Sequence, residues 1–298
     1  MKSKPDPEVT QAALRVENLS VTYPPFSEQP HLEGSLPPEH IGSHADVERT
    51  VLDNIQLTVP PGTTLGIVGH TGSGKTTLAR VLARQLEVPP GTVFVDDQDI
   101  TSFPLGDLRE HVGYVPQDAF LFSESLRDNV SLANPDVEDE AVLAALAGAQ
   151  LDKDLDQLPE GLDTVIGERG VNLSGGQRQR TALARVLLFD PKLLILDDTL
   201  SAVDTNTAES ILEYLRPFAA GRTTILIAHR LSSLSHAEQI IVLDAGKIVE
   251  RGTHQELLDL GGRYAATWTL QQESEDNAVR ASQLEEELDL GFDAEPDR

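Results

Sequence analysis

A glycine-rich segment constrains the fold of this chain more than any other part of its sequence. Residues 69–76, GHTGSGKT, fit the pattern G-x-x-x-x-G-K-[S/T]; the apolar run TLGIVG leads into them and the helical pattern TTLARVLARQL follows. Glycines let a backbone turn tightly around a phosphate group, and the N–H groups at the start of a helix face the anion. The sequence therefore predicts a phosphate-binding loop between a buried strand and a helix.

The residues of this loop have predicted contacts with a nucleotide. Lys75 is expected to reach its β and γ phosphates, and the hydroxyl of Thr76 is expected to ligate Mg2+. The other contacts are expected from the neighbouring residues Gly69, His70, Thr71, Gly72, Ser73, Gly74 and Thr77. A glycine-rich turn that binds nothing is the alternative, which the flanking strand and helix disfavour.

Two adjacent carboxylates follow a second apolar strand. Residues 193–198, LLILDD, run from four apolar residues into Asp197 and Asp198. Ligands of an open parallel sheet bind at the carboxyl ends of its strands, so Asp197 is expected beside Thr76. We predict that Asp197 and Thr76 together hold Mg2+. The alternative is that Asp197 is only a turn residue at the end of a strand.

The remaining pattern predicts the fold class and the domain organisation. Strand-like segments recur at 14–23, 52–60, 64–69, 92–100, 112–117, 193–198, 223–229 and 239–252. Strands that alternate with helices imply a parallel sheet covered on both faces, so the class is α/β. Helical periodicity at about 118–190 interrupts this alternation and predicts an inserted helical lobe.

Both ends of the chain and one internal segment fall outside the predicted domain at 14–270. We expect a flexible N-terminus at 1–13 and a loop insertion at 24–50. Residues 271–298 contain ten Asp or Glu against two Arg, which predicts a disordered acidic tail. The insertion contains three histidines without regular ligand spacing, so we predict a solvated loop and not a metal site; they are His31, His40 and His44.

Composition excludes several functional classes. The chain has no cysteine, which excludes disulfides, thiol nucleophiles and cysteine metal sites. Its net charge of −26 argues against nucleic acid or an anionic membrane surface as a partner. No apolar stretch reaches the roughly 18 residues of a membrane helix, and the first residues lack the apolar run of a signal peptide. We therefore expect a cytoplasmic chain.

The segment 171–198, VNLSGGQRQRTALARVLLFDPKLLILDD, resembles the ABC ATPase family. LSGGQ (173–177) is similar to the signature of that family, and it begins a second helix whose N-terminus could face an anion. The resemblance implies that two nucleotide domains pair head to tail, so that each signature closes on the ATP of the other. It assigns these ATP contacts to Ser174, Gly175, Gly176 and Gln177. It also implies a P-loop NTPase (RecA-like) parallel core, an antiparallel β subdomain and an inserted α-helical subdomain.

Four further residues match the family one by one. Tyr23 resembles the aromatic residue that stacks on adenine, although a core tyrosine at a strand end is the alternative. Gln117, in YVPQD, is similar to the glutamine that touches the metal and senses the transmembrane partner. Asp204, in SAVD, lies in a segment that resembles the loop crossing the dimer. His229 resembles the switch histidine that contacts the γ phosphate.

Two segments narrow the resemblance to ABC exporters. Glu168-Arg169-Gly170 precede the signature as they do in exporters, and FLFSESLRDNV (120–130) is also similar to the exporter pattern. Such exporters carry transmembrane domains on the same chain, ahead of the nucleotide domain. We therefore expect either an excised fragment or one subunit of a larger assembly, held at the cytoplasmic face of the membrane by transmembrane domains outside this sequence.

Asp198 departs from the family pattern, which has glutamate there to polarise the attacking water. Aspartate is one methylene shorter, so its carboxylate falls back by roughly 1.5 Å. A misplacement of about 1 Å can lower a rate by about 100-fold. We predict a poor hydrolyser that uses Asp198, His229 and Gln117. The resemblance to heterodimeric exporters implies a partner with an intact glutamate. The alternatives are a slow homodimer, a soluble ABC ATPase without a transport function, and a non-hydrolysing regulatory module.

Overall fold

The computed structural model describes residues 8–24, 48–167, 171–274, 277 and 280, and their strands form two sheets. The strands are β1 (Leu14–Tyr23), β2 (Arg49–Val59), β3 (Thr64–Val68), β4 (Val93–Val95), β5 (Gln98–Asp99), β6 (Val112–Val115), β7 (Leu193–Asp197), β8 (Thr223–Ile227), β9 (Gln239–Asp244) and β10 (Lys247–Gly252). One sheet has the order β2-β1-β4-β5 and is antiparallel. The other has the order β10-β9-β3-β8-β7-β6, and only β10 is antiparallel to its neighbour. The predicted α/β class, with a parallel core and an antiparallel subdomain, is confirmed.

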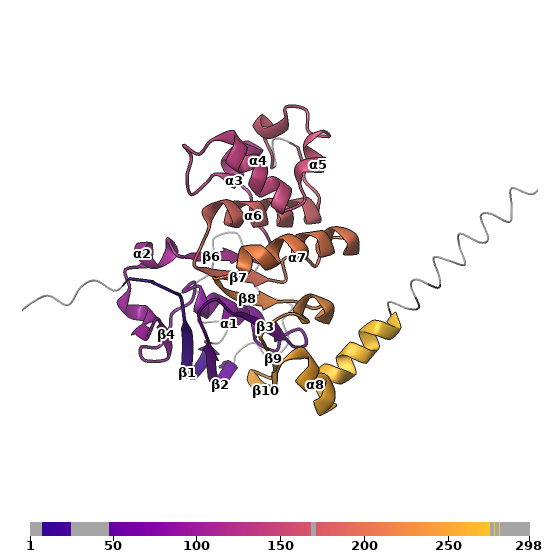
Figure 1. Ribbon diagram of the computed structural model, residues 1–298. Coiled ribbons are helices and arrows are strands. Elements are labelled where there is room, and N and C mark those ends of the chain that lie inside the picture. Colours follow the sequence, from indigo (N-terminus) through magenta and orange to yellow (C-terminus); the bar gives the residue numbers. More distant parts are fainter. Residues whose placement is uncertain (1–7, 25–47, 168–170, 275–276, 278–279, 281–298) are drawn as a thin grey trace, which may run out of the picture.

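Helices surround the parallel sheet (Figure 1). The α-helices are α1 (Lys75–Leu82), α2 (Leu105–Arg109), α3 (Leu126–Val130), α4 (Asp139–Gly148), α5 (Asp152–Leu155), α6 (Gly175–Phe189), α7 (Thr205–Ala219) and α8 (His254–Leu260). The short 3-10 helices are η2 (Ile100–Ser102), η3 (Gly161–Asp163) and η4 (Leu231–Leu234). No helix in the part of the chain that the structure describes is long and apolar enough to cross a membrane.

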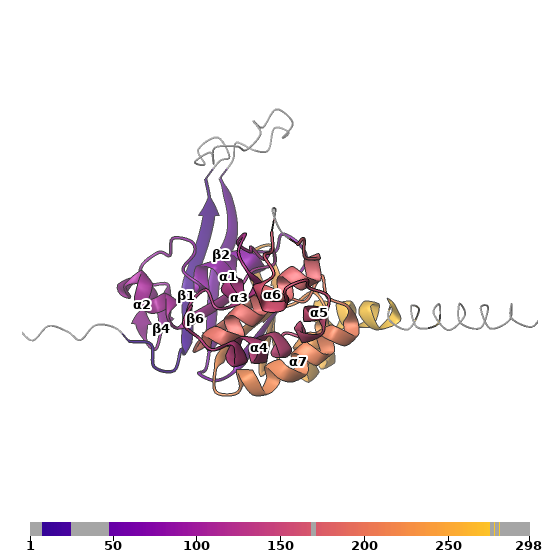
Figure 2. The ribbon, with the colours of Figure 1, turned by 90° about the horizontal axis from the view of Figure 1, so that it is seen from above.

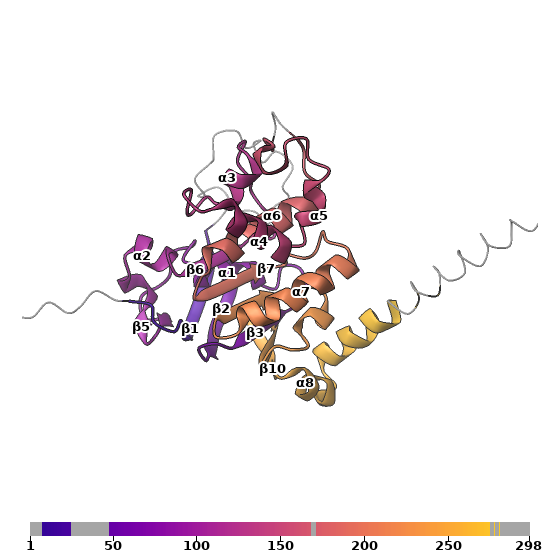
Figure 3. The same ribbon diagram turned by 45° about the horizontal axis from the view of Figure 1, so that its top comes forward.

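Alternation along β7 explains how the sheet is covered on both faces. Successive side chains of a strand point to opposite faces. Leu193 and Ile195 belong to a core shared with α1 and the antiparallel sheet, whereas Leu194 and Leu196 belong to a core shared with α4, α6 and α7. All five residues of β7 are buried. A strand with apolar side chains on both faces is stable only when both faces are covered. Figure 3 shows α4, α6 and α7 on one face of the sheet.

The lobe predicted at about 118–190 contains α3, α4, α5 and α6. Helix α6 is more than a part of this lobe, because its residues Leu183 and Leu187 pack in the same core as Leu194 of the sheet. This helix therefore joins the lobe rigidly to the parallel sheet, and Figure 1 shows it between the two.

The predicted insertion at 24–50 begins and ends in a long hairpin. Strands β1 and β2 pair as far as Tyr23 opposite Arg49, so residues 49 and 50 belong to β2 and not to a loop. Residues 25–47, with the three histidines, lie outside the described residues. Figure 2 shows the two strands projecting together from the molecule.

The prediction that residues 1–13 are flexible is wrong for residues 8–13. The backbone N–H groups of residues 10–13 all donate to the carboxylate of Asp96, at 2.7 to 3.2 Å, and Val9 and Ala12 are buried. Asp96 lies in the two-residue turn between β4 and β5 and has φ 48, which aspartate tolerates better than most residues. The anchor was missed because it joins segments more than 80 positions apart in the sequence.

Asp96→Asn is expected to weaken this anchor and to lower the free energy of unfolding by about 1–3 kcal/mol, because one oxygen that accepts N–H groups becomes a donor. Burial opposes ionisation of Asp96, but the backbone hydrogen bonds outweigh it and lower its pKa. A lowered pKa means that the contribution is present above the usual aspartate range and is lost as the pH falls through the folded-state pKa. Urea unfolding at neutral and acidic pH measures both effects. Asp97→Asn, in the same turn, is the matched control; equal losses would contradict the anchor.

The predicted domain end at 270 lies inside a helix. Residues 263–274 are helical and pack after α8, where Figure 1 shows them in yellow. Tyr264 of this helix is fully buried and Trp268 packs against the same small core, which also contains Leu231 and Leu257. Residues 281–298 of the predicted tail lie outside the described residues.

Candidate functional site

The glycine-rich loop joins β3 to α1 in the predicted order. Gly74 caps α1 with φ 106, a backbone conformation that residues with a Cβ rarely adopt. A Cβ on Gly69 would overlap the carbonyl oxygen of Leu243 in the neighbouring strand β9. These two glycines are therefore required by the backbone itself, and they bring the loop close to the carboxyl edge of the sheet.

The ammonium group of Lys75 lies within the curve of this loop. Its Nζ donates to the carbonyl oxygens of Gly69 at 2.7 Å and His70 at 3.0 Å, and only 7% of the residue is exposed. Burial lowers the pKa of Lys75, and the charges of Asp198 and Asp197 oppose that shift. A cation held by loop carbonyls and two carboxylates is positioned to neutralise an anion that enters the loop.

Asp197 and Thr76 meet at the end of β7 as predicted. Thr76 Oγ1 donates to Asp197 Oδ1 at 3.3 Å, and the hydroxyl of Tyr114 donates to Asp197 Oδ2 at 3.2 Å. Burial raises the pKa of Asp197, while these two hydrogen bonds lower it. Burial and the charge of Asp197 also raise the pKa of Tyr114, which keeps its proton on the phenol. Tyr114 was missed by the sequence analysis, since a tyrosine inside an apolar strand reads as a core residue.

These residues fit Mg2+ held jointly with phosphate. Thr76 and Asp197 offer a hydroxyl and one carboxylate, and Mg2+ is usually held by one or two such groups together with substrate phosphates. Among the described residues there is no group of three or more His, Asp or Glu side chains that could hold a metal ion. The donor set therefore suits an ion that arrives with a nucleotide.

Asp198 lies between two residues predicted to act with it. Gln117 Nε2 donates to Asp198 Oδ2 at 3.3 Å, and His229 Nε2 lies 3.7 Å from the same oxygen. The Asp198 side chain is 8% exposed, and its backbone has φ 50. Its N–H donates to the carbonyl oxygen of Ile227 at 2.9 Å, which fixes the backbone of Asp198 against β8. The three side chains from three separate loops thus converge on one point.

The signature segment forms a separate feature at the start of α6. The Ser174 hydroxyl accepts from the N–H of Gln177 at 3.2 Å, and Gln177 Oε1 accepts from the N–H of Ser174 at 2.9 Å, which is a capping box. Gln177 also donates to Asp154, which forms an ion pair with Arg180 at 2.9 Å. Within the described residues, no hydrogen bond or ion pair joins 173–177 to the loop at 69–77. The helix start is therefore ordered without a partner in its own phosphate-binding loop.

The segment 201–204 passes directly under the signature. A Cβ on Gly176 would lie 2.7 Å from the carbonyl oxygen of Ala202, so the two backbones approach too closely for a side chain. Asp204 caps α7 and accepts from the N–H of Thr207 at 3.0 Å, and this hydrogen bond lowers its pKa. Its carboxylate is thereby engaged within this chain, and it strengthens the helix start.

Gln179 connects these loops and was missed by the sequence analysis. Its Nε2 donates to the carbonyl oxygen of Gln117 at 3.1 Å and to Ser201 Oγ at 3.2 Å, and its Oε1 accepts from the N–H of Ala202 at 3.1 Å. Ser201 Oγ in turn donates to the carbonyl oxygen of Asp198 at 2.9 Å. A glutamine among the arginines of a helix reads as a surface residue, so no sequence signal distinguished it.

Gln179→Met is expected to lower the free energy of unfolding by about 1–3 kcal/mol, because the carbonyl oxygen of Gln117, the hydroxyl of Ser201 and the N–H of Ala202 lose their partner while the side-chain length is kept. Chemical denaturation measures this change. Gln255→Met replaces an exposed glutamine of α8 that donates to Asp259, and it serves as the control. A loss no larger than that of the control would show that the three loops are held by other contacts.

Some of the predicted site residues come together in the structure and others do not. The structure brings Lys75, Thr76, Gln117, Asp197, Asp198 and His229 together at the carboxyl edge of the sheet. Tyr23 ends β1, partly exposed and paired through its backbone with Arg49, and within the described residues it makes no hydrogen bond to that cluster. Glu168-Arg169-Gly170 lie outside the described residues. His70 hydrogen-bonds to Asp244 at 2.8 Å, so its ring faces β9.

The fold and the site together define a P-loop nucleotide-binding domain with a second capped helix start at Ser174. The family model for ABC transporters matches residues 52–201, from within β2 through the phosphate-binding loop and the signature to Ser201, just beyond the carboxylate pair. The chain belongs to the ABC transporter family and is an ATPase domain of that family with the P-loop NTPase fold.

Relatives with similar sequences and structures carry names of exporters. A probable multidrug resistance ABC transporter ATP-binding/permease protein of Bacillus subtilis is 47% identical over 221 residues, which are 74% of this chain and 38% of the relative. An ATP-dependent lipid A-core flippase of Legionella pneumophila is 41% identical over 241 residues, 81% of this chain and 41% of the relative. A bacterial Atm1-family ABC exporter with ATP bound has a TM-score of 0.78 at 34% identity, over 91% of this chain and 44% of that chain. The chain thus spans less than half the length of these relatives.

Proposed function

We propose that this chain binds Mg-ATP and pairs head to tail with a second ATP-binding domain to drive export through transmembrane domains. One observation carries the proposal: the chain has two helix starts suited to anions, at Lys75 and at Ser174, and they belong to different parts of the fold. The first has a cation and a pair of Mg2+ ligands beside it, so it is the site for the chain's own ATP. The second is capped and ordered but has no phosphate-binding loop of its own opposite it.

Each residue of the first site has a role in the proposal. The Lys75 ammonium neutralises the β and γ phosphates, and Thr76 and Asp197 hold Mg2+, which spreads charge away from the phosphate oxygens. Gln117 and His229 flank the place where the γ phosphate would end. The ring of Tyr23 offers a face on which adenine can stack.

The proposal includes weak hydrolysis at this first site. The Asp198 carboxylate is short for a base in this position, and both flanking side chains point at its Oδ2 atom. The signature at Ser174 is intact in sequence and capped in structure, so it can complete a competent site on a partner. We therefore infer a heterodimer whose other half has glutamate at the position of Asp198. A homodimer with slow turnover is the alternative.

An exposed aromatic pair supports a transmembrane partner. Phe120 is 68% exposed and Phe122 is 42% exposed, and their rings meet edge to face at 5.0 Å, three to five positions after Gln117. Exposed aromatic side chains are typical of protein interfaces. We propose that membrane helices dock here, which would hold the chain at the cytoplasmic face. A soluble ABC ATPase acting on nucleic acid is disfavoured by the net charge of −26.

The proposal is tested with a variant that changes the helix start at Ser174 and leaves the helix start at Lys75 intact. Ser174→Arg is expected to leave the ATP affinity of the isolated chain within about twofold, yet to abolish its ATP-dependent pairing with a second domain, because arginine would collide with the other ATP. Equilibrium binding of a fluorescent ATP analogue measures the first effect and light scattering with Mg-ATP the second. A large loss of affinity in the isolated chain would assign the signature to the chain's own ATP and overturn the head-to-tail arrangement.

A further inference from the structure

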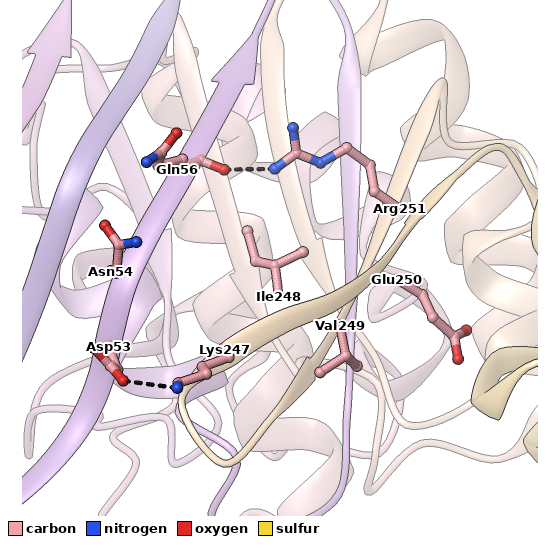
Figure 4. A pocket seen from close by; sticks show the side chains of 8 residues that line it. All are labelled: Asp53, Asn54, Gln56, Lys247, Ile248, Val249, Glu250 and Arg251. Atoms are coloured by element: carbon pink, nitrogen blue, oxygen red, sulfur yellow. Dashed lines mark hydrogen bonds and ion pairs between the residues drawn. The ribbon is translucent and has the colours of Figure 1, made fainter.

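The 263–274 helix is anchored to the strand β10 at its first turn. The Glu250 carboxylate accepts hydrogen bonds from the N–H groups of Arg263 and Tyr264. Figure 4 shows Glu250 at one side of a groove that it helps to line, in which Lys247 and Arg251 reach across to β2. Carboxylates are stabilising at the N-terminus of a helix, so this contact fixes where the helix begins.

The same helix is linked to the phosphate-binding loop. The Arg263 guanidinium forms an ion pair with Asp244 Oδ2 at 2.5 Å, and Asp244 Oδ1 lies 2.8 Å from Nε2 of His70. The buried hydroxyl of Tyr264 meets Nδ1 of His254 at 2.8 Å. The first half of the helix is therefore held by bonds to β10, β9 and α8.

The second half of the helix reaches the segment that contains His229. Gln271 Nε2 donates to the carbonyl oxygen of His229 at 2.6 Å, and Gln271 Oε1 accepts from the N–H of Leu231 at 2.9 Å. One carboxamide thus satisfies both main-chain groups that flank Arg230. Strand β8 has already ended at Ile227, so these groups have no strand partner.

Beside these polar bridges, a cavity lies between the helix and the loops, while Leu231 packs in the same apolar core as Tyr264 of the helix. The cavity has a volume of about 410 Å3 and is bordered by Gly69 and His70 of the loop, by His229, and by Thr267 and Gln271 of the helix. Because packing does not fill this space, loss of the Gln271 bonds would not be compensated by neighbouring side chains. Leu231 is held by packing, whereas the carbonyl oxygen of His229 is held by its hydrogen bond from Gln271.

We propose that Gln271 is a positioning residue for the nucleotide site, and that the 263–274 helix acts as a brace that aims His229 at the γ phosphate. The inference rests on the proposed function for the role of His229. Gln271 acts only through the main chain of the 229–231 segment and does not touch the nucleotide. The position of His229 in the site thus depends on a helix that lies outside the segment 52–201 matched by the family model.

The test compares Gln271→Met with Gln271→Glu. Methionine keeps the length and helical preference but loses both hydrogen bonds, whereas glutamate keeps only the acceptor for the N–H of Leu231. Thr269→Ala, on the same helix, is the control, since within the described part of the chain the Thr269 hydroxyl bonds only to Ala265 one turn earlier. In chains that also contain Asp198→Glu, we expect Gln271→Met to lower kcat by about 10-fold with the KM for Mg-ATP within about twofold, and Gln271→Glu to lie between.

A second measurement tests the brace without nucleotide. The imidazole C–H signal of His229, assigned by its loss in His229→Gln, is expected to shift and sharpen in Gln271→Met at an unchanged Tm, and to remain as in the unaltered chain in Thr269→Ala. An unchanged signal would overturn the inference, as would equal losses of kcat in Gln271→Met and Thr269→Ala. If the unaltered chain fails to bind ATP, the proposed function fails, and the His229 signal still decides the role of Gln271.

Discussion

Lys75→Met is expected to weaken Mg-ATP binding by about 100-fold or more, because losing a desolvated charge partner of phosphate costs several kcal/mol. The Lys75 ammonium is almost fully buried, bonded to two loop carbonyls and flanked by Asp197 and Asp198. Methionine has nearly the same length, so the volume within the loop is kept while the charge is lost. Equilibrium titration with a fluorescent ATP analogue in Mg2+ measures the change in Kd.

The control for this prediction is a lysine outside the loop. Lys247→Met removes a side chain that forms an ion pair with Asp53 at 3.1 Å on β2, and it is expected to leave ATP affinity within about twofold. Thermal unfolding of both variants checks that the loop variant remains folded, since it leaves two buried carboxylates without their cation. Unchanged affinity in a folded Lys75→Met chain would contradict a phosphate site at this loop.

Asp198→Glu is expected to raise ATP turnover at the chain's own site by about 10- to 100-fold. The added methylene moves the carboxylate by roughly 1.5 Å toward the expected position of the attacking water, and displacements near 1 Å change rates by about this factor. The backbone at Asp198 has φ 50, which aspartate tolerates better than glutamate, so a small loss of stability accompanies the gain. Phosphate release at saturating Mg-ATP measures the turnover.

A matched variant separates the effect of side-chain length at position 198 from the effect of the carboxylate charge. Asp198→Asn keeps the size and the tolerance for positive φ but removes the base, so its turnover is expected to fall below that of the unaltered chain. Brisk turnover by the unaltered chain, unchanged in Asp198→Glu, would contradict a weak site at Asp198. ATP binding without turnover in every variant and every pairing would instead favour a regulatory module.

Much of the fold was predictable because its signals are local. The short uninterrupted apolar runs at β3, β7 and β8 predict buried strands, and the loop at 69–76 is predicted from its own eight residues. Contacts that join distant segments were missed. Asp96 gathers the N–H groups of residues 10–13, and the predicted flexible end is wrong there because the carboxylate that orders it lies in another hairpin.

In the candidate site, too, some contacts were predictable from the sequence and others were not. The proximity of Thr76 and Asp197 followed from the rule that ligands bind at the carboxyl ends of parallel strands, and the structure joins their oxygens at 3.3 Å. No such rule exists for Gln179 or Gln271, whose carboxamides bond to the main chain of loops far away in the sequence. A glutamine has the same local pattern whether its amide meets water or a buried carbonyl.

The sequence by itself determined the fold class, the phosphate-binding loop and the departure at Asp198, because each is encoded in contiguous residues with a defined chemistry. Only the tertiary structure decided how Gln117, Asp198 and His229 converge, how residues 8–13 are held, and which side chains fix the loops around them. The physical reason is that hydrogen-bond partners of loop backbones are chosen by three-dimensional packing, which periodicity along a chain does not record.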